Sequence, residues 1–146
     1  TISTGEKPSM TNKIFLDTAF AIALVSPKDT FHEKAVSLSN QLRQSKPQLI
    51  TTRAILIEIG NSLAKENERK AAIEIIESIE ADETITTVPV TEEIYKDAFN
   101  LFRSRSDKEW GLTDCISFTV MKKLEVSEAL TSDHHFQQAG FTALMR

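Results

Sequence analysis

Two acidic residues come just after segments whose composition predicts β-strands. Asp17 follows the apolar run of residues 14–16, and Asp133 follows the short segment of residues 128–131. In α/β sheets ligands bind beyond the carboxyl ends of the strands, so both carboxylates would face a binding crevice. The alternative for each is a helix N-cap, a position that Asp also favours.

Two further acids lie in predicted helices. Glu58 is flanked by apolar residues in the helix of residues 52–65, and a Glu beside a buried stripe is rare unless it is paired or binds a metal. The alternative is a boundary residue that reaches solvent. Asp114 lies in the first turn of the helix of residues 113–123, where stabilisation by the helix dipole is the alternative. Because these alternatives do not account for all four acids together, the sequence favours a shared carboxylate site.

Segments with the apolar pattern of strands alternate with segments of helical period, which predicts an α/β fold with a mostly parallel sheet. The predicted strands are residues 13–17, 48–51, 85–90, 128–131 and 141–145. The predicted helices are residues 30–42, 52–65, 69–79, a segment that begins after Thr91, and residues 113–123. Thr30 and Glu33 have the spacing of a capping box. In the helix of residues 69–79, Ile73, Ile76 and Ile79 are expected to face the core.

Length and composition are those of one ordinary domain. The chain has 146 residues, of which 40% are hydrophobic and 26% charged, so a hydrophobic core can form without disulfides or structural metals. A single cysteine excludes an internal disulfide and fits a reducing, cytoplasmic compartment. The longest apolar run, residues 19–25, is far shorter than the ~20 residues that span a bilayer. The net charge of -4 argues against a protein that only binds nucleic acid, but not against a nuclease whose acids hold cations.

The domain is predicted to span residues 13–146. Residues 1–12 are polar, contain Gly5 and Pro8, and lack the apolar core of a signal peptide. Because the sequence starts at Thr1 and not at a methionine, Met10 is the expected natural start. We expect residues 1–12 to be an N-terminal extension that is either a cloning remnant or disordered.

Four short motifs, taken in order, resemble those of the PIN-domain family, and within it the VapC-like ribonuclease toxins of toxin–antitoxin pairs. The motifs are IFLDT at residues 14–18, TTRA at 51–54 continuing to EIGN at 58–61, WGLTDCISF at 110–118, and LTSDHHF at 130–136. Each motif is short, but their order and spacing together are fairly specific. The resemblance extends from about Lys13 to the C-terminus.

The resemblance implies a three-layer α/β/α sandwich with a mostly parallel sheet of about five strands. The resemblance also implies that Thr18 and Thr131 occupy the positions at which the family has hydroxyl side chains, one after the first acid and one before the last. Ala19 is a departure, because many relatives have a small polar residue at that position. The implied activity is that of an endoribonuclease toxin that requires Mg²⁺ or Mn²⁺. The implied partners are RNA, a cognate antitoxin protein that blocks the site, and a second copy of the chain in a homodimer. The acids that the family uses for catalysis and metal binding fall on Asp17, Glu58, Asp114 and Asp133.

Four converging carboxylates would repel one another, and a divalent cation would reverse the sign of that energy. At an effective dielectric of ~20, each pair of like charges about 5 Å apart costs on the order of 3 kcal/mol, which would raise the pKa of at least one acid. Hard oxygen ligands suit Mg²⁺ or Mn²⁺, and no His and Cys set in the sequence has zinc spacing. We hypothesise that Asp17, Glu58 and Asp114 hold one cation, while Asp133 helps to place a second or orients the attacking water.

Three arginines are candidate RNA-binding residues. Arg53 opens the helix that carries Glu58, and Arg103 and Arg105 precede the helix that carries Asp114. The alternative is a solvated helix face.

Several reactive residues are not expected to take part in chemistry. Cys115 is expected to be buried and inert, because no His is placed to activate it. His134 and His135 adjoin Asp133, so a proton-shuttle role is an alternative for them, but a helix-start or surface role is expected for both. Trp110 is expected to be a packing anchor.

Other functions remain alternatives. An aspartyl-phosphate phosphatase needs a second Asp two residues after the first, where this chain has Ala19. A receiver-like domain needs paired acids at the first strand, and that pair is absent. A catalytically silent PIN-fold binding module and another metal-dependent α/β phosphohydrolase stay open.

Overall fold

A sheet of five strands forms the centre of the protein. The computed structural model describes residues 13–146, and the predicted extension of residues 1–12 lies outside the described part. The strands are β1 Lys13–Leu16, β2 Gln48–Thr52, β3 Ile85–Val88, β4 Glu128–Leu130 and β5 Thr142–Ala143. Their order is β3-β2-β1-β4-β5, and every neighbouring pair is parallel. The predicted parallel sheet of about five strands is confirmed.

The central position of β1 follows from its composition. Ile14, Phe15 and Leu16 are all buried, as expected for a strand that is covered on both faces. Phe15 is paired with Ile50 of β2 on one side and with Ala129 of β4 on the other. The carboxyl end of β1 therefore lies between the ends of two neighbouring strands, in the region where α/β folds bind ligands.

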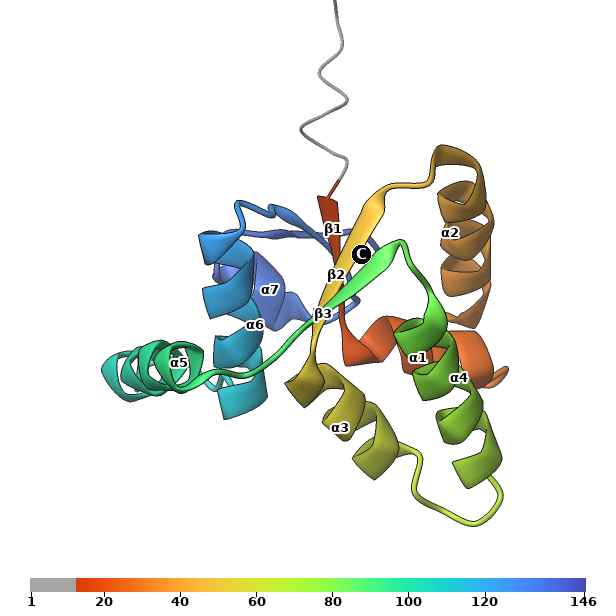
Figure 1. The fold of residues 1–146 in the computed structure, drawn as a ribbon, viewed down its shortest axis with the longest axis horizontal. Helices are drawn as coiled ribbons and strands as arrows, with labels where there is room; N and C mark the ends of the chain where they lie inside the picture. Colours follow the sequence, from red (N-terminus) through yellow and green to blue (C-terminus); the bar gives the residue numbers. More distant parts are fainter. Residues whose placement is uncertain (1–12) are drawn as a thin grey trace, which may run out of the picture.

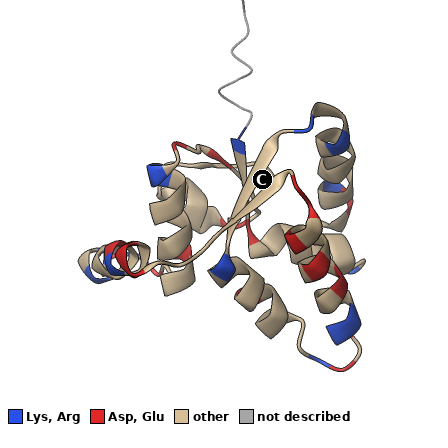
Figure 2. Cartoon of the chain, in the orientation of Figure 1, with Lys and Arg blue, Asp and Glu red and all other residues tan. Residues whose placement is uncertain are grey.

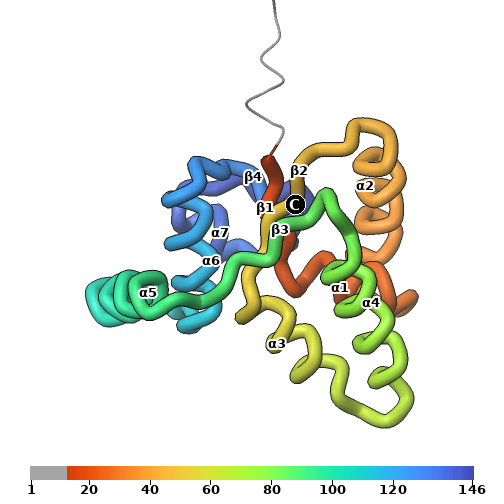
Figure 3. Tube along the Cα trace, viewed as in Figure 1, coloured from red at the N-terminus to blue at the C-terminus, as the bar shows by residue number. Residues whose placement is uncertain are grey.

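Helices cover both faces of the sheet, which gives the predicted three-layer α/β/α sandwich. On one side of the sheet lie α1, α2 and α4, and on the other lie α6 and α7 (Figure 1). α5 packs on α6 and projects outward from the sheet (Figure 3). The helices are α1 Thr18–Val25, α2 His32–Ser45, α3 Arg53–Ser62, α4 Arg69–Ala81, α5 Glu92–Ser104, α6 Leu112–Lys123 and α7 His134–Gln138.

Two helices were not predicted. α1 is apolar along most of its length and its residues are buried or half-buried, so it lacks the polar face from which a helical period is recognised. α7 has five residues, which is too short for a period of 3.6 residues to show. Both helices begin directly after an acid of the predicted site.

Two detailed expectations were wrong. The capping box of Thr30 and Glu33 does not form, because α2 begins only at His32 and its N-cap residue has no side-chain cap. Instead, the Asp29 carboxylate accepts a hydrogen bond from the Phe31 N–H at 2.8 Å and closes a turn before the helix. Ile73 is 50% exposed and does not face the core, because α4 meets the rest of the protein through a narrower stripe that includes Ala72 and Ile79.

An aromatic cluster fixes α6 and α7, the two helices at whose starts the later acids lie. The Phe118 ring of α6 meets the Phe136 ring of α7 edge-on, with centroids 5.0 Å apart. The same Phe118 ring meets Trp110 at 5.1 Å, also edge-on. Such contacts add about 0.5–1.5 kcal/mol each beyond the burial of area. They hold the start of α6 against α7.

The charged residues of the surface fit a solvated exterior. Asp and Glu gather along α4 (Figure 2), where Glu74, Glu77 and Glu80 are exposed. These acids are not part of the predicted site. Within residues 13–146, no helix combines the length and apolar character that crossing a bilayer requires.

Candidate active site

Asp17 lies at the carboxyl end of β1 and occupies the N-cap position of α1. Its N–H donates to the Leu130 carbonyl at 3.3 Å, which extends the contact with β4 beyond the strand. The residue is buried, yet its carboxylate makes no capping hydrogen bond to α1. The N-cap alternative therefore does not explain why a buried carboxylate stands here.

The Thr131 hydroxyl joins two of the acids. It donates a hydrogen bond to Asp17 Oδ2 at 2.7 Å and accepts one from the Asp133 N–H at 3.0 Å. Thr131 is fully buried, so its orientation is fixed. One side chain thus holds the carboxylate at the end of β1 beside the backbone of the residue that precedes α7.

The Thr18 hydroxyl makes a corresponding link on the other side. It donates a hydrogen bond to Glu58 Oε1 of α3. Glu58 is half-buried and therefore does not behave as a boundary residue that simply reaches solvent. The link places Glu58 beside the start of α1, next to Asp17.

Asp114 and Asp133 share one histidine. Asp133 caps α7, because its Oδ1 accepts a hydrogen bond from the His135 N–H at 2.9 Å. Asp114 Oδ2 accepts one from the Gly111 N–H at 3.0 Å, as a residue of the first helical turn often does. The His135 Nδ1 atom lies 3.2 Å from Asp114 Oδ2 and 3.3 Å from Asp133 Oδ1. Asp133 is thus a helix N-cap and Asp114 stabilises the first turn of its helix, as the alternatives from the sequence proposed. These local roles do not prevent either acid from belonging to the cluster.

The four acids are close enough for the charge of one to affect the pKa of another. Burial raises the pKa of the Asp17 carboxyl to about 7, against the opposing effect of the Thr131 hydrogen bond and with added repulsion from Glu58 and Asp114. Burial also raises the pKa of Asp114, and the charges of Asp133 and Glu58 add to the rise. The structure therefore brings all four predicted acids into one cluster. Their roles in catalysis and metal binding stay predictions.

The donor set of this cluster suits a hard divalent cation. It offers several carboxylate oxygens, which Mg²⁺ and Mn²⁺ prefer. Burial is the main cause of the raised pKa of Asp17, repulsion from Glu58 and Asp114 adds to it, and no neighbouring positive charge within residues 13–146 is among the groups that lower this pKa. A bound cation would supply a compensating positive charge.

Comparison with known proteins decides the family. Residues 14–142 match the family model described as PIN domain. The chain belongs to the PIN-domain family. The resemblance of the four sequence motifs is thereby confirmed.

Relatives and solved structures agree with this assignment. The PIN domain is 29% identical over 129 residues to a Mycobacterium tuberculosis protein described as 23S rRNA-specific endonuclease VapC20, covering 88% of this chain and 95% of that protein. The crystal structure of VapC20, described as a sarcin-ricin loop cleaving toxin, matches with a TM-score of 0.77 at 28% identity, over 88% of this chain and 96% of that one. FitAcB from Neisseria gonorrhoeae matches with a TM-score of 0.61 at 19% identity, over 89% and 94% of the two chains, and shares the fold.

The three candidate RNA-binding arginines of this PIN domain each have a partner. Arg53 forms an ion pair with Glu80 at 2.7 Å. The Arg105 guanidinium donates two hydrogen bonds to the Asp107 carboxylate, at 2.9 and 3.0 Å. Arg103 lies over the Phe99 ring, 4.8 Å from its centroid. These surface contacts are weak enough to exchange for a phosphate, so RNA binding by the three residues stays a prediction.

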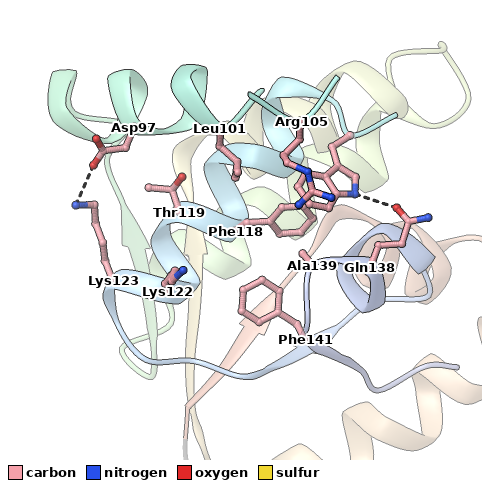
Figure 4. A pocket seen from close by; sticks show the side chains of 11 residues that line it. Asp97, Leu101, Arg105, Phe118, Thr119, Lys122, Lys123, Gln138, Ala139 and Phe141 are labelled. Carbon is pink, nitrogen blue, oxygen red and sulfur yellow. Dashed lines mark hydrogen bonds and ion pairs between the residues drawn. The ribbon is translucent and has the colours of Figure 1, made fainter. Parts of the chain in front are cut away.

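Arg105 also borders a cavity of about 480 Å³ between α5, α6 and α7. Figure 4 shows its apolar floor, formed by Leu101, Phe118 and Phe141, with Lys122 among the surrounding side chains. None of the four acids lines this cavity. It is therefore separate from the carboxylate cluster.

The residues that were set aside behave largely as predicted. Cys115 is fully buried, and burial raises the pKa of its thiol to about 11, so it is not a nucleophile. Trp110 is buried and donates a hydrogen bond from Nε1 to Gln138 Oε1 at 3.0 Å, as a packing anchor does. The His134 side chain is exposed. His135 is the exception, because nothing in the sequence indicated its contact with Asp114.

The link through Thr131 gives a testable expectation. Replacing Thr131 by Val keeps the shape but removes the hydroxyl that orients Asp17 and contacts Asp133. We expect metal affinity and any RNA cleavage to fall by about 10–100-fold, measured by metal titration and by cleavage rate. The matched control is Thr51→Val, because the Thr51 hydroxyl is equally buried but bonds only the Leu16 carbonyl, at 2.9 Å. Equal losses in both variants would show that Thr131 acts on the core and not on the site.

Proposed function

We propose that this PIN domain is a metal-dependent endoribonuclease that hydrolyses RNA phosphodiester bonds and acts as the toxin of a toxin–antitoxin pair. The observation that carries the proposal is the cluster of four acids joined by two hydroxyls and one imidazole. Similarity to VapC20 over most of both chains supports RNA as the substrate class. The acids proposed as catalytic and metal-binding residues are Asp17, Glu58, Asp114 and Asp133.

Mg²⁺ or Mn²⁺ is the proposed cofactor. Asp17, Glu58 and Asp114 would hold one ion, and Asp133 would help to place a second or orient the attacking water. When bound, such ions stabilise the charge on the entering and leaving oxygens of an in-line displacement at phosphorus.

The protein's own groups have distinct tasks in this proposal. Thr131 and Thr18 act through the acids, because their hydroxyls fix the orientation of Asp17 and Glu58. The Asp133 side chain is 31% exposed, compared with 19% for Asp114. Asp133 is therefore the better placed of the two to accept a hydrogen bond from an attacking water that arrives from solvent.

Partners and compartment follow from the same proposal. A toxin of this kind needs a cognate antitoxin protein, and the proposed antitoxin covers the carboxylate cluster. A homodimer and a cytoplasmic location are also proposed, the latter because the substrate is RNA and the single cysteine is a free, buried thiol.

The decisive test is incubation of the purified chain with total cellular RNA. Reactions would contain Mg²⁺, Mn²⁺ or a chelator, and the new ends would be mapped by sequencing. We expect discrete cuts only when a divalent ion is present. Stabilisation by the metal without any cut would favour the catalytically silent binding module instead.

The proposed RNA contacts have a separate test. Replacing Arg103 and Arg105 together by Gln should weaken RNA binding and reduce the slope of log affinity against log salt, because fewer counterions are released. Binding would be measured at several salt concentrations with the metal-free protein. The control is Arg43→Gln. Arg43 belongs to α2, which lies on the opposite side of the sheet from α6 (Figure 1), and its guanidinium donates a hydrogen bond to Asn40 of the same helix. Its replacement should leave the slope unchanged. An unchanged slope in the double variant would remove both arginines from the interface.

A further inference from the structure

We propose that His135 is a nitrogen ligand of the cation and that it makes this site prefer Mn²⁺ to Mg²⁺. The inference rests on the proposed function, because it assumes that the carboxylate cluster binds a divalent ion. It adds a residue that the four-acid set does not include. The observation behind it is the position of one ring atom, Nδ1, between two carboxylate oxygens from different helices.

The distances from the His135 ring to the two acids fit neighbouring ligands around one ion as well as a hydrogen bond. The Nδ1 atom is 3.2 Å from Asp114 Oδ2 and 3.3 Å from Asp133 Oδ1. Two ligands at right angles on an octahedral ion with bonds of ~2.1 Å lie about 3 Å apart. The second ion of the proposed function, which Asp133 helps to place, would therefore have the imidazole nitrogen within reach without a large rearrangement if Asp114 also binds it.

The ring is held in this position by its own segment. The His135 N–H donates to Asp133 Oδ1 at 2.9 Å, which fixes the backbone at the start of α7. The next residue, Phe136, is fully buried against Phe118 and Phe15. The His135 side chain is only 21% exposed, so the imidazole is presented to the acids and not to bulk solvent.

The adjacent histidine provides a natural contrast. His134 can reach the same carboxylate, and its ligand atom, that of His135 and that of Asp133 all lie within 4.8 Å of one another. However, the His134 side chain is 58% exposed, and its Nδ1 lies 3.8 Å from Asp133 Oδ1. Of the two rings, His135 alone is also in contact with Asp114.

A nitrogen ligand changes which ion the site prefers. Mg²⁺ retains oxygen ligands and water and gives them up reluctantly. Mn²⁺ shares the preference of Mg²⁺ for carboxylate oxygen, but as a first-row transition ion it also accepts an imidazole nitrogen. A site made of carboxylates and one imidazole should therefore bind Mn²⁺ more tightly than Mg²⁺, whereas a site of carboxylates alone would discriminate less.

The rival explanation is that His135 only positions the carboxylates. In that case Nδ1–H donates a hydrogen bond to the acids and the ring never touches the ion. Removal of the ring would then weaken Mg²⁺ and Mn²⁺ binding to the same extent, since both ions use the same carboxylates.

The test uses the whole chain, stripped of metal and loaded with Mn²⁺ alone. Pulsed electron paramagnetic resonance would detect a directly bound ¹⁴N nucleus, and Mg²⁺ and Mn²⁺ affinities would be measured by titration. We expect a ¹⁴N coupling in the wild type that disappears in His135→Asn and persists in the control His134→Asn. We also expect His135→Asn to weaken Mn²⁺ binding by about tenfold or more and Mg²⁺ binding much less.

The outcomes separate this inference from the proposed function. Bound Mn²⁺ without a ¹⁴N coupling in the wild type, or equal losses for both ions in His135→Asn, would overturn the ligand role of His135 and leave the carboxylate site standing. Failure of the wild type to bind either ion would overturn the proposed metal site itself. If His135→Asn folds poorly, the His134→Asn spectrum still decides, because a ¹⁴N coupling that persists there cannot come from His134.

Discussion

The Asp17→Asn variant is expected to cleave RNA at least roughly a thousandfold more slowly than the wild type. Bound cations contribute several kcal/mol to stabilisation of the transition state, and each 1.36 kcal/mol corresponds to a factor of ten in rate. Asp17 is the most buried of the acids and lies at the centre of the cluster, with Glu58 and Asp114 both close enough to affect its pKa. Loss of its charge should therefore disable metal binding as a whole.

The same variant is expected to fold at least as stably as the wild type in metal-free buffer. Asn has nearly the shape of Asp, and its side-chain oxygen can still accept the hydrogen bond from Thr131. The substitution also removes a buried charge that is costly when unpaired. Thermal unfolding with and without Mg²⁺ would show this, because only the wild type should gain stability from the ion.

A control variant distinguishes loss of metal binding at Asp17 from a general effect of removing one negative charge from the protein. Glu74 is an exposed acid on α4, so Glu74→Gln changes the net charge equally and should leave cleavage and metal response unchanged. Cleavage by Asp17→Asn at the wild-type rate would remove Asp17 from the mechanism. Unfolding of that variant would instead show that the Asp17 charge is needed for the fold.

The metal-free protein is expected to lose stability as the pH rises from about 4 to about 7. The pKa of Asp17 is near its ordinary value of 3.8 in the unfolded chain and about 7 in the folded protein. Between these values the folded protein holds a proton that the unfolded chain has released, so the free energy of unfolding falls as pH increases. A rise of about three pKa units corresponds to a loss on the order of 4 kcal/mol over this window.

The pH effect can be isolated by comparison with Asp17→Asn. Chemical unfolding in the presence of a chelator would be measured for both proteins at several pH values. The difference in stability between them should change with pH below 7 and level off above it. Saturating Mg²⁺ should reverse the trend in the wild type, because the ion binds the ionised carboxylate. A difference independent of pH would show that the Asp17 carboxyl ionises at an ordinary pKa.

Much of the fold follows from local sequence pattern. The apolar run of residues 14–16 identified the central strand, and the alternation of strands and helices indicated a parallel sheet. α1 was missed because a helix buried on most sides has no polar face to reveal its period. Ile73 was placed wrongly because an apolar residue in a helix does not show how wide the buried stripe is.

The carboxylate cluster was predictable only in part. Acids after strands pointed to the correct end of the sheet for Asp17 and Asp133, and an acid beside an apolar stripe singled out Glu58. Asp114, in the first turn of a helix, was weak evidence alone, and the family resemblance added weight to it. The contact of His135 with Asp114 depends on how α6 packs against α7 through Phe118 and Phe136. No spacing along the chain encodes that packing. The same holds for the ion pair of Arg53 with Glu80, which joins the start of α3 to α4.

The hydrogen bond from Thr131 to Asp17 joins positions 114 residues apart. Because Asp17 is synthesised before Thr131, a growing polypeptide carries Asp17 throughout the translation of the residues between them, before Thr131 exists to orient it. Unfinished copies of this protein therefore lack the assembled cluster. If the cluster cleaves RNA, a ribosome that is making the enzyme is protected from its own product until the late strand has docked.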